Sequence, residues 1–211
     1  LPLYDEARWF EDDEPLQLPE NFYSSEYLVD RLIEFIGDTP GDQPFFGYLS
    51  FQAVHIPVQT PPEFTARYSD RYLDGWNVVR KTRFNEAIQR GIVPPTTRLI
   101  DMPTTREWNE LSTAEQERES MQMAVYAGMV EAMDHHLGRL ISHLEQIDQY
   151  TNTLFIVTSD NGPEPSDPLA SAGPLFPWWL RLNGYHTDIE GIGERGSFNF
   201  LGTHNASAAA S

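Results

Sequence analysis

The chain has 211 residues, of which 40% are apolar, and its 32 acidic and 14 basic side chains give a formal net charge of −18. A field of this sign repels nucleic acid and anionic membranes, so neither is an expected partner. No run of the sequence approaches the roughly 20 apolar residues of a membrane span. The absence of cysteine excludes disulfides, thiolate metal sites and a cysteine nucleophile within these residues.

The first predicted regular element is a helix over residues 24–36. Residues 1–22 precede it and are predicted to form an irregular acidic arm, because three prolines interrupt any periodicity. Ser24 is a suitable N-cap for the helix, and Gly37 suits the left-handed conformation that often follows a helix. The predicted apolar face consists of Leu28, Leu32, Phe35 and Ile36.

A strand is predicted next, over the apolar run FFGYLSF at residues 45–51, and its continuity is typical of a strand covered on both faces. The loop QAVHIPVQTPP follows and carries His55. Residues 63–111 are rich in proline and are predicted to be an excursion on the domain surface. Within this excursion a helix could use Val78, Phe84, Ala87 and Ile88.

The clearest element is a long helix that begins after Ser112. Ser112 and Glu115 have the spacing of a capping box, in which each side chain reaches the other residue's backbone N–H. Apolar residues then recur at spacings of three and four over roughly 35 residues. These are Met121, Val125, Met129, Met133, Leu137, Leu140, Leu144 and Ile147. A second strand, TLFIVT at residues 153–158, follows and runs into SDNG, and everything after Gly162 reads as loop.

Two apolar strands joined through a long helix predict a parallel α/β sheet. The carboxyl ends of parallel strands share one edge, and ligands of open α/β sheets bind outside that edge. His55 follows the first strand, and Asp160 and Asn161 follow the second. We therefore expect these three residues to face one crevice.

The chemistry of these residues allows a functional and an ordinary interpretation. Asp160 and Asn161 offer hard oxygen ligands of the kind that Ca²⁺ and Mg²⁺ prefer, but Asp-Asn-Gly is also a common turn. His55 can exchange a proton or hold an anion, although a lone loop histidine is often only a surface residue. His135, His136 and His143 are predicted to lie on a solvated face of the long helix.

Several stretches resemble the sulfatase family. PFFGYLSFQAVHIPVQTPPEF is similar to the sulfatase segment in which a Pro-Phe-Phe strand leads into an Ala-x-His-x-Pro-x-Gln-x-Pro loop. YAGMVEAMDHHLGRLISHLEQIDQYTNTLFIVTSDNG resembles the long helix and metal-binding strand of the same family, and LPENFYSSEYLVDRLIEFI resembles the preceding helix. The nearest likeness is to bacterial arylsulfatases with an insertion, which here runs over about residues 63–111.

The resemblance implies an alkaline-phosphatase-like fold, with a mixed, mostly parallel sheet and helices on both faces. It implies a Ca²⁺ ion, with Mg²⁺ as an option, that is held in part by Asp160 and Asn161. It also implies that His55 contacts the sulfate and assists the departing alcohol. A formylglycine nucleophile would hydrolyse a sulfate ester, a small molecule, with the metal neutralising sulfate oxygens.

The match is incomplete in ways that leave three interpretations open. No Cys/Ser-x-Pro-x-Arg string is present, so the nucleophile is expected in a missing N-terminal segment, and Thr203 and Asn205 stand where the family has Pro and Trp. Residues 1–211 are thus expected to be an incomplete sulfatase catalytic domain that is inactive alone. Its full-length parent would be an arylsulfatase, a phosphonate or phosphate monoester hydrolase of the same superfamily, or a non-catalytic binding module. The oligomeric state and the compartment, bacterial cytoplasm or periplasm, stay open.

Overall fold

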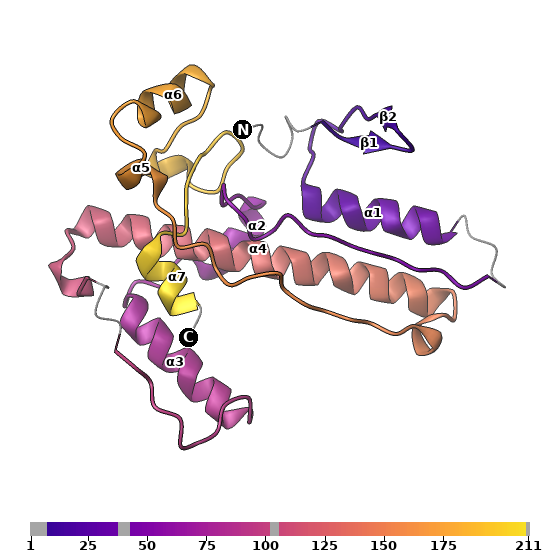
Figure 1. Cartoon of the computed structure of the whole chain (residues 1–211), viewed down its shortest axis with the longest axis horizontal. Helices are drawn as coiled ribbons and strands as arrows, with labels where there is room; N and C mark the ends of the chain where they lie inside the picture. The colour runs from indigo at the N-terminus through magenta and orange to yellow at the C-terminus, as the bar shows by residue number, and fades with distance from the viewer. Residues whose placement is uncertain (1–7, 38–42, 102–105, 210–211) are drawn as a thin grey trace. The chain divides into compact units, whose positions relative to one another are not determined.

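The computed structural model describes residues 8–37, 43–101 and 106–209 (Figure 1). It divides into two compact units. The first unit comprises residues up to Val54 together with Val130–Thr158, and the second comprises His55–Met129 together with Ser159–Ser211. One helix, α4, contributes residues to both units.

The regular elements of the described residues are mainly helical, and their bounds run in chain order as follows. The α-helices are α1 (Ser24–Gly37), α2 (Pro62–Thr65), α3 (Trp76–Gln89), α4 (Thr113–Gln146), α5 (Pro168–Ser171), α6 (Phe176–Leu182) and α7 (Thr203–Ala209). The 3-10 turns are η1 (Ala66–Tyr68), η2 (Trp108–Glu110), η3 (Tyr150–Asn152) and η4 (Ile189–Gly191). Two short strands, β1 (Phe10–Glu11) and β2 (Glu14–Pro15), pair antiparallel.

The N-terminal part of the chain differs from its prediction in one respect. Residues 10–15 form the β1–β2 pair, where an irregular arm was expected, while residues 1–7 of that arm lie outside the described residues. Among the described residues, no helix combines the length and the apolar character that a membrane crossing needs.

The predicted helix over 24–36 is confirmed as α1, and its apolar side forms the core of the first unit. The predicted apolar face is wrong at Phe35, which is 47% exposed, whereas Val29, which was not predicted, is fully buried. Val29 and Ile36 are buried together with Leu140 and Leu144 of α4, and partly buried Leu32 and Ile33 pack against them. Arg139 of α4 also binds α1, with its Nη2 donating to Asp30 Oδ1 at 2.5 Å. The amphipathic pattern of each helix therefore supplies one half of this core.

The predicted strand at 45–51 is extended but has no β partner among the described residues. Its side chains alternate. Phe45, Leu49 and Phe51 pack on the α1–α4 core, whereas Phe46 is 91% and Tyr48 82% exposed. This period of two is the geometry of a strand that is covered on one face.

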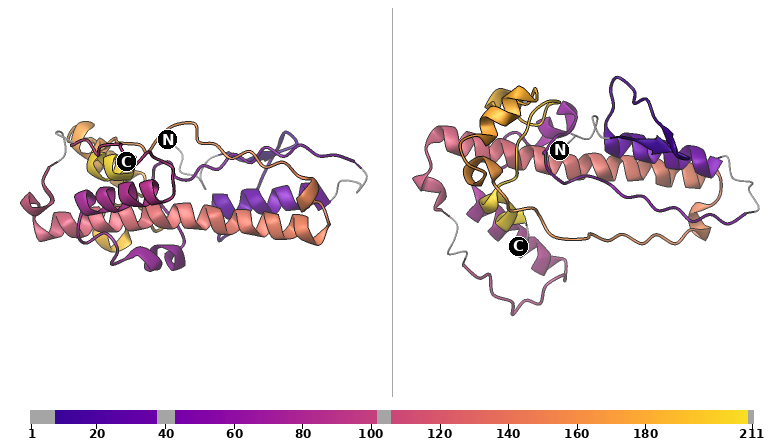
Figure 2. Two further views of the ribbon diagram at one scale, coloured as in Figure 1. Left: turned by 90° about the horizontal axis from the view of Figure 1, so that it is seen from below. Right: turned by 45° about the horizontal axis from the view of Figure 1, so that its top comes forward.

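The second predicted strand, residues 153–158, is also extended and lies outside the sheet that the described residues form, and it is exposed at Leu154, Ile156 and Val157. Both extended segments run in the same direction, opposite to α4 (Figures 1 and 2). A shared direction is what a parallel arrangement requires. Because the only sheet of the described residues is β1–β2, the parallel sheet itself stays a prediction.

The long helix is confirmed as α4, with 34 residues, and the capping box forms at its start. The last residue of the predicted apolar stripe, Ile147, lies beyond the helix and is exposed. The Ser112 N–H donates to Glu115 Oε2 at 2.7 Å, and the Glu115 N–H donates to Ser112 Oγ at 3.3 Å. These bonds satisfy backbone donors that the first turn of a helix leaves without partners.

The core of the second unit uses residues from the predicted surface excursion, which corrects that expectation. Trp76 of α3 and Trp108 of η2 are buried with Leu111 and Ala208, and the two indole rings pack edge to face at 4.9 Å. The helix expected in this region exists as α3, but it buries Trp76 and leaves Val78 exposed. The buried side chains of Trp76 and Trp108 therefore tie the excursion to the fold.

The region after Gly162 is more ordered than its loop-like composition predicts. It contains α5, α6 and α7, and the extended residues 197–201 between them are buried. Phe198 lies 5.2 Å from Phe200, 5.5 Å from Tyr185 and 6.1 Å from Phe176, measured between ring centroids. This aromatic cluster holds a segment that has no long helical or strand pattern of its own.

Candidate active site

His55 is the first residue of the second unit, and its side chain is exposed. Its Nδ1 atom lies 2.8 Å from the carbonyl oxygen of Ile56. A carbonyl oxygen only accepts hydrogen bonds, so Nδ1 carries a hydrogen and donates it. Proton exchange with a substrate therefore falls to Nε2, the other nitrogen of the ring.

The residues that follow His55 are held by the backbone of a distant segment. The Val58 N–H donates to the Asn199 carbonyl at 3.0 Å, and the Thr60 N–H donates to the Gly193 carbonyl at 3.1 Å. Val58 and Thr60 are both buried. The candidate imidazole thus stands in solvent at the end of an anchored stretch of chain.

Asp160 and Asn161 lie in an exposed turn that begins at the end of the extended segment 153–158. The Asn161 N–H donates to Asp160 Oδ1 at 2.9 Å, and the Ser159 hydroxyl donates to the Asn161 carbonyl at 2.6 Å. A Cβ added at Gly162 would meet nothing within 4 Å. The local bonds set the shape of the turn, and the space beside it is open.

The donor set of this turn fits a hard cation only in part. It offers one carboxylate and one amide oxygen, whereas Ca²⁺ takes roughly six to eight oxygen ligands and Mg²⁺ takes about six. Among residues 8–37, 43–101 and 106–209, no three His, Asp or Glu side chains gather to hold a metal ion. A cation bound here therefore requires further ligands.

The second unit contains all three predicted site residues, since it includes His55 and everything from Ser159 onward. His55 also acts electrostatically on Glu164, four residues after Asp160. The pKa of Glu164 lies below its usual range, first because Ser166 donates to its carboxylate and, to a smaller extent, because of the charge of His55. That interaction reaches the segment that begins with the Asp-Asn pair, while direct contact of His55 with Asp160 stays a prediction.

Sequence reasoning missed a buried polar cluster, which Glu119 of α4 forms with Asn205 of α7. The Asn205 side-chain amide donates to Glu119 Oε2 at 2.8 Å and to the Glu119 carbonyl at 2.9 Å. Burial, and next the negative charge of Asp167, raises the pKa of Glu119 to about 7. Asn205 is 4% exposed, so this position, where the resembled pattern differs, belongs to the interior.

The expectation for the helix histidines is wrong at His136, which is buried and not solvated. Its Nδ1 lies 3.2 Å from Arg139 Nη1, and its ring is 6.2 Å from that of Tyr23. Burial, together with the positive charge of Arg139, lowers the pKa of His136 to about 4. His136 is therefore a neutral core residue of the first unit, whereas its neighbour His135 is exposed.

Comparison with known proteins gives one family. Residues 3–191 match the family model described as Sulfatase. The chain is 36% identical over 192 residues to an uncharacterized sulfatase of Schizosaccharomyces pombe. The aligned region covers 90% of this chain and 34% of that protein. The chain is also 33% identical over 199 residues to an arylsulfatase of Klebsiella aerogenes, and this aligned region covers 94% of the chain and 42% of that enzyme.

A third relative is more distant. The chain is 27% identical over 157 residues to the multifunctional alkaline phosphatase superfamily protein PehA of Trinickia caryophylli, over 74% of this chain and 30% of that protein. The chain thus spans between about a third and two-fifths of the length of these relatives.

Proposed function

The chain belongs to the sulfatase family, and from this premise we propose that the full-length protein is a metal-dependent arylsulfatase. Family membership implies the alkaline-phosphatase-like α/β fold and, in general terms, sulfate ester hydrolysis. The resemblance to an arylsulfatase over 94% of the chain supports the aryl class of substrate.

In this proposal Asp160 and Asn161 supply two oxygen ligands to a Ca²⁺ or Mg²⁺ ion. The exposed turn and the open space beside Gly162 support that role. The remaining ligands and a formylglycine nucleophile would come from the part of the relatives' length that this chain does not span. The bound ion would supply charge neutralisation at the sulfate oxygens.

The imidazolium form of His55 would donate a proton from Nε2 to the departing alcohol, which leaves the neutral ring with its hydrogen on Nδ1. The observation that carries this assignment is the Nδ1–H hydrogen bond to Ile56, because it fixes which nitrogen is presented to a substrate. The anchored backbone at Val58 and Thr60 supports it further, since general acids act well only when their position is fixed.

A phosphate or phosphonate monoester hydrolase is the second candidate. The relative PehA, named as a multifunctional alkaline phosphatase superfamily protein, favours it. Sulfate and phosphate esters present similar tetrahedral anions, so Asp160, Asn161 and His55 would keep their roles. Parallel assays of the full-length protein on an aryl sulfate and the matching aryl phosphate distinguish the two, and turnover of the phosphate alone would overturn the sulfatase proposal.

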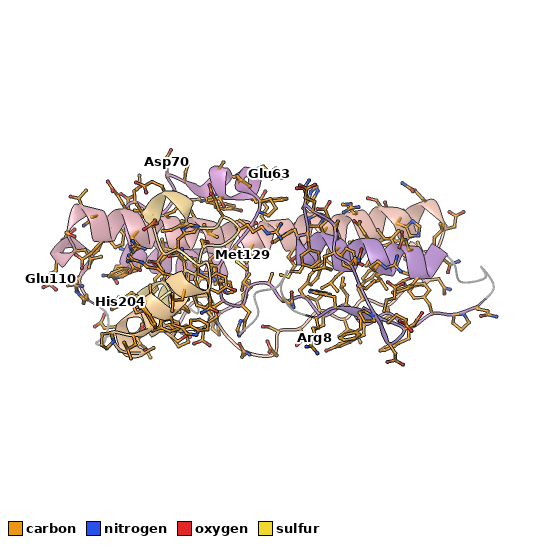
Figure 3. The ribbon with its side chains drawn as sticks, turned by 90° about the horizontal axis from the view of Figure 1, so that it is seen from above. Arg8, Glu63, Asp70, Glu110, Met129 and His204 are labelled. Atoms are coloured by element: carbon orange, nitrogen blue, oxygen red, sulfur yellow. The ribbon has the colours of Figure 1, made fainter. Side chains whose placement is uncertain are left out.

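The metal assignment is tested by Asp160→Ala in the full-length protein. We expect calcium binding and turnover to be abolished, as measured by calorimetric titration and by aryl sulfate hydrolysis. Asp70→Ala is the matched control, because Asp70 is an exposed aspartate of the same unit that projects away from the ribbon (Figure 3). Unchanged calcium affinity in Asp160→Ala would remove this residue from the metal site.

The acid assignment is tested by His55→Ala. Loss of acid catalysis costs about 10² to 10⁴ in rate, so we expect turnover to fall by that factor while calcium affinity stays the same. His135→Ala, at an exposed histidine of α4, should leave turnover unchanged. A His55→Ala enzyme with the wild-type rate would rule His55 out.

A further inference from the structure

The loop that follows His55 lies against residues 193–199, more than 130 positions later in the chain. Besides the backbone bonds of Val58 and Thr60, a side chain joins the two segments. Gln59 Nε2 donates to the Ser197 carbonyl at 2.7 Å, and Gln59 also forms a parallel β-bridge with Gly193. Three consecutive residues of the loop are thus bonded to one receiving segment.

The receiving segment is itself held firmly by its surroundings. Ser197 and Asn199 are fully buried, and the rings of Phe198 and Phe200 belong to the aromatic cluster described above. Gly193 has φ +90°, and an added Cβ would lie 2.6 Å from Val125 of α4. Close packing of this kind leaves the segment little freedom to move.

A short chain of contacts leads from this segment to the imidazole. Asn199 holds the backbone at Val58, and two residues earlier the Ile56 carbonyl accepts the Nδ1–H of His55. Displacing the loop would displace the Ile56 carbonyl and turn the ring with it. The side chain whose bond can be removed without altering the backbone is Gln59.

We propose that Gln59 is a positioning residue, which fixes the His55 loop on residues 193–199 and thereby sets the orientation of the imidazole. The catalytic importance of that orientation rests on the function proposed above, whereas the contact between loop and segment does not. The receiving residues lie beyond position 191, where the match to the family model ends. The proposed positioning of the His55 loop therefore depends on residues 193–199, which the match to the family model does not cover.

The test is Gln59→Met in the full-length protein, which keeps the side-chain length and removes the N–H donor. We expect peptides that cover residues 56–62 to exchange amide hydrogens about five- to tenfold faster, the factor for one hydrogen bond of ordinary net strength. The imidazole Cε1–H signal of His55 should move in NMR spectra while that of His204 does not. The kcat for an aryl sulfate should fall with little change in KM.

Gln116→Met is the matched control, because Gln116 Nε2 donates to the Trp108 carbonyl at 2.9 Å in the same unit. It should change neither the 56–62 peptides nor the His55 signal. Gln59→Glu, which has the same shape without an N–H, should reproduce Gln59→Met and serves if the methionine variant folds poorly.

Unchanged exchange and an unchanged His55 signal in both Gln59 variants would overturn the proposal, as would the same changes in Gln116→Met. If the full-length protein hydrolyses no sulfate ester, the proposed function fails separately. The exchange and NMR measurements would still decide the positioning role.

Discussion

Two apolar extended segments of this chain, one in each unit, have opposite surroundings. Residues 153–158 of the first unit leave Leu154 83% exposed, whereas residues 197–201 of the second unit bury Leu201 to 1%. Neither belongs to a paired strand among the described residues. The continuous apolar run is thus the exposed one, while the segment with two polar residues, Ser197 and Asn199, is buried.

The difference lies in what the surrounding chain supplies. Residues 197–201 pack within the aromatic cluster and accept a hydrogen bond from the His55 loop, and both of these neighbours belong to the second unit. Residues 153–158 receive no strand neighbour from the described part of the chain, and their backbone N–H and C=O groups are of the kind that another strand can pair. An apolar pattern indicates that a segment can be buried, while the available neighbours decide whether it is.

The largest effect is expected when the same substitution is made in both segments. Leu201→Ala should lower the free energy of unfolding by about 3 kcal/mol, because it removes a fully buried side chain and leaves a cavity. Leu154→Ala in this chain should change it by less than about 0.5 kcal/mol. Urea unfolding followed by circular dichroism measures both. Equal costs for the two variants would contradict the difference in burial.

A smaller effect is expected from Glu119, whose folded pKa of about 7 lies above its usual 4.5. The raised pKa means that this group's stabilisation is complete below pH 4.5 and is lost as pH rises through about 7. Since each pKa unit corresponds to about 1.4 kcal/mol, the shift bounds the loss at roughly 3 to 4 kcal/mol, and solvent screening of this partly exposed side chain reduces it below the cost of Leu201→Ala. Glu119→Gln stays neutral, and its side chain can still accept the hydrogen bond from Asn205. In this variant the free energy of unfolding of the second unit should no longer fall as pH rises through about 7.

The pH dependence of Glu119 is separable from that of its neighbours. Asp167 and Glu115 add negative charge around it, while Arg118 and Arg106 add positive charge. Glu117→Gln, at an exposed position of α4, is the control and should keep the wild-type pH profile. Unfolding midpoints in urea from pH 4 to 8 supply the measurement. An unaltered slope in Glu119→Gln would show that Glu119 titrates normally.

The smallest effect concerns the start of α4. Ser112→Ala removes the hydroxyl that accepts from the Glu115 N–H, and loss of such a cap costs about 1 kcal/mol. Ser142→Ala makes the same change within the helix, at an exposed residue of the first unit, and should cost nothing. A comparison of their melting temperatures is sufficient. A Ser142 variant as unstable as the Ser112 variant would mean that the cap is not the cause.

The sequence predicted those features that depend on local periodicity. The apolar spacing in α1 and α4 and the capping box at Ser112 are encoded within a few turns of helix, so they could be read directly. Burial that depends on distant partners could not. His136 was expected in solvent because nothing near it in the sequence indicates the packing of Tyr23 against its ring.

The same reasoning applies to the candidate site. Asp160, Asn161 and His55 could be proposed because strand ends and oxygen donors are visible in the sequence. The anchoring of Gln59 by Ser197 could not, because it joins residues 138 positions apart through a backbone carbonyl that every residue possesses. Nor could the hydrogen bond from Asn205 to Glu119, because it joins residues 86 positions apart.

Helix α4 crosses the boundary between the two units without a break, because one unit takes its residues to Met129 and the other starts at Val130. Cutting the chain there would create two new helix ends. Backbone N–H groups would lose their hydrogen-bond partners at one end, and backbone C=O groups would lose theirs at the other. Protein engineers who wish to split, permute or graft this molecule should therefore cut in the exposed stretch around Gly91 and Ile92 instead. Because each unit consists of two separate stretches of the chain, no single cut yields either unit whole, even though each has its own core.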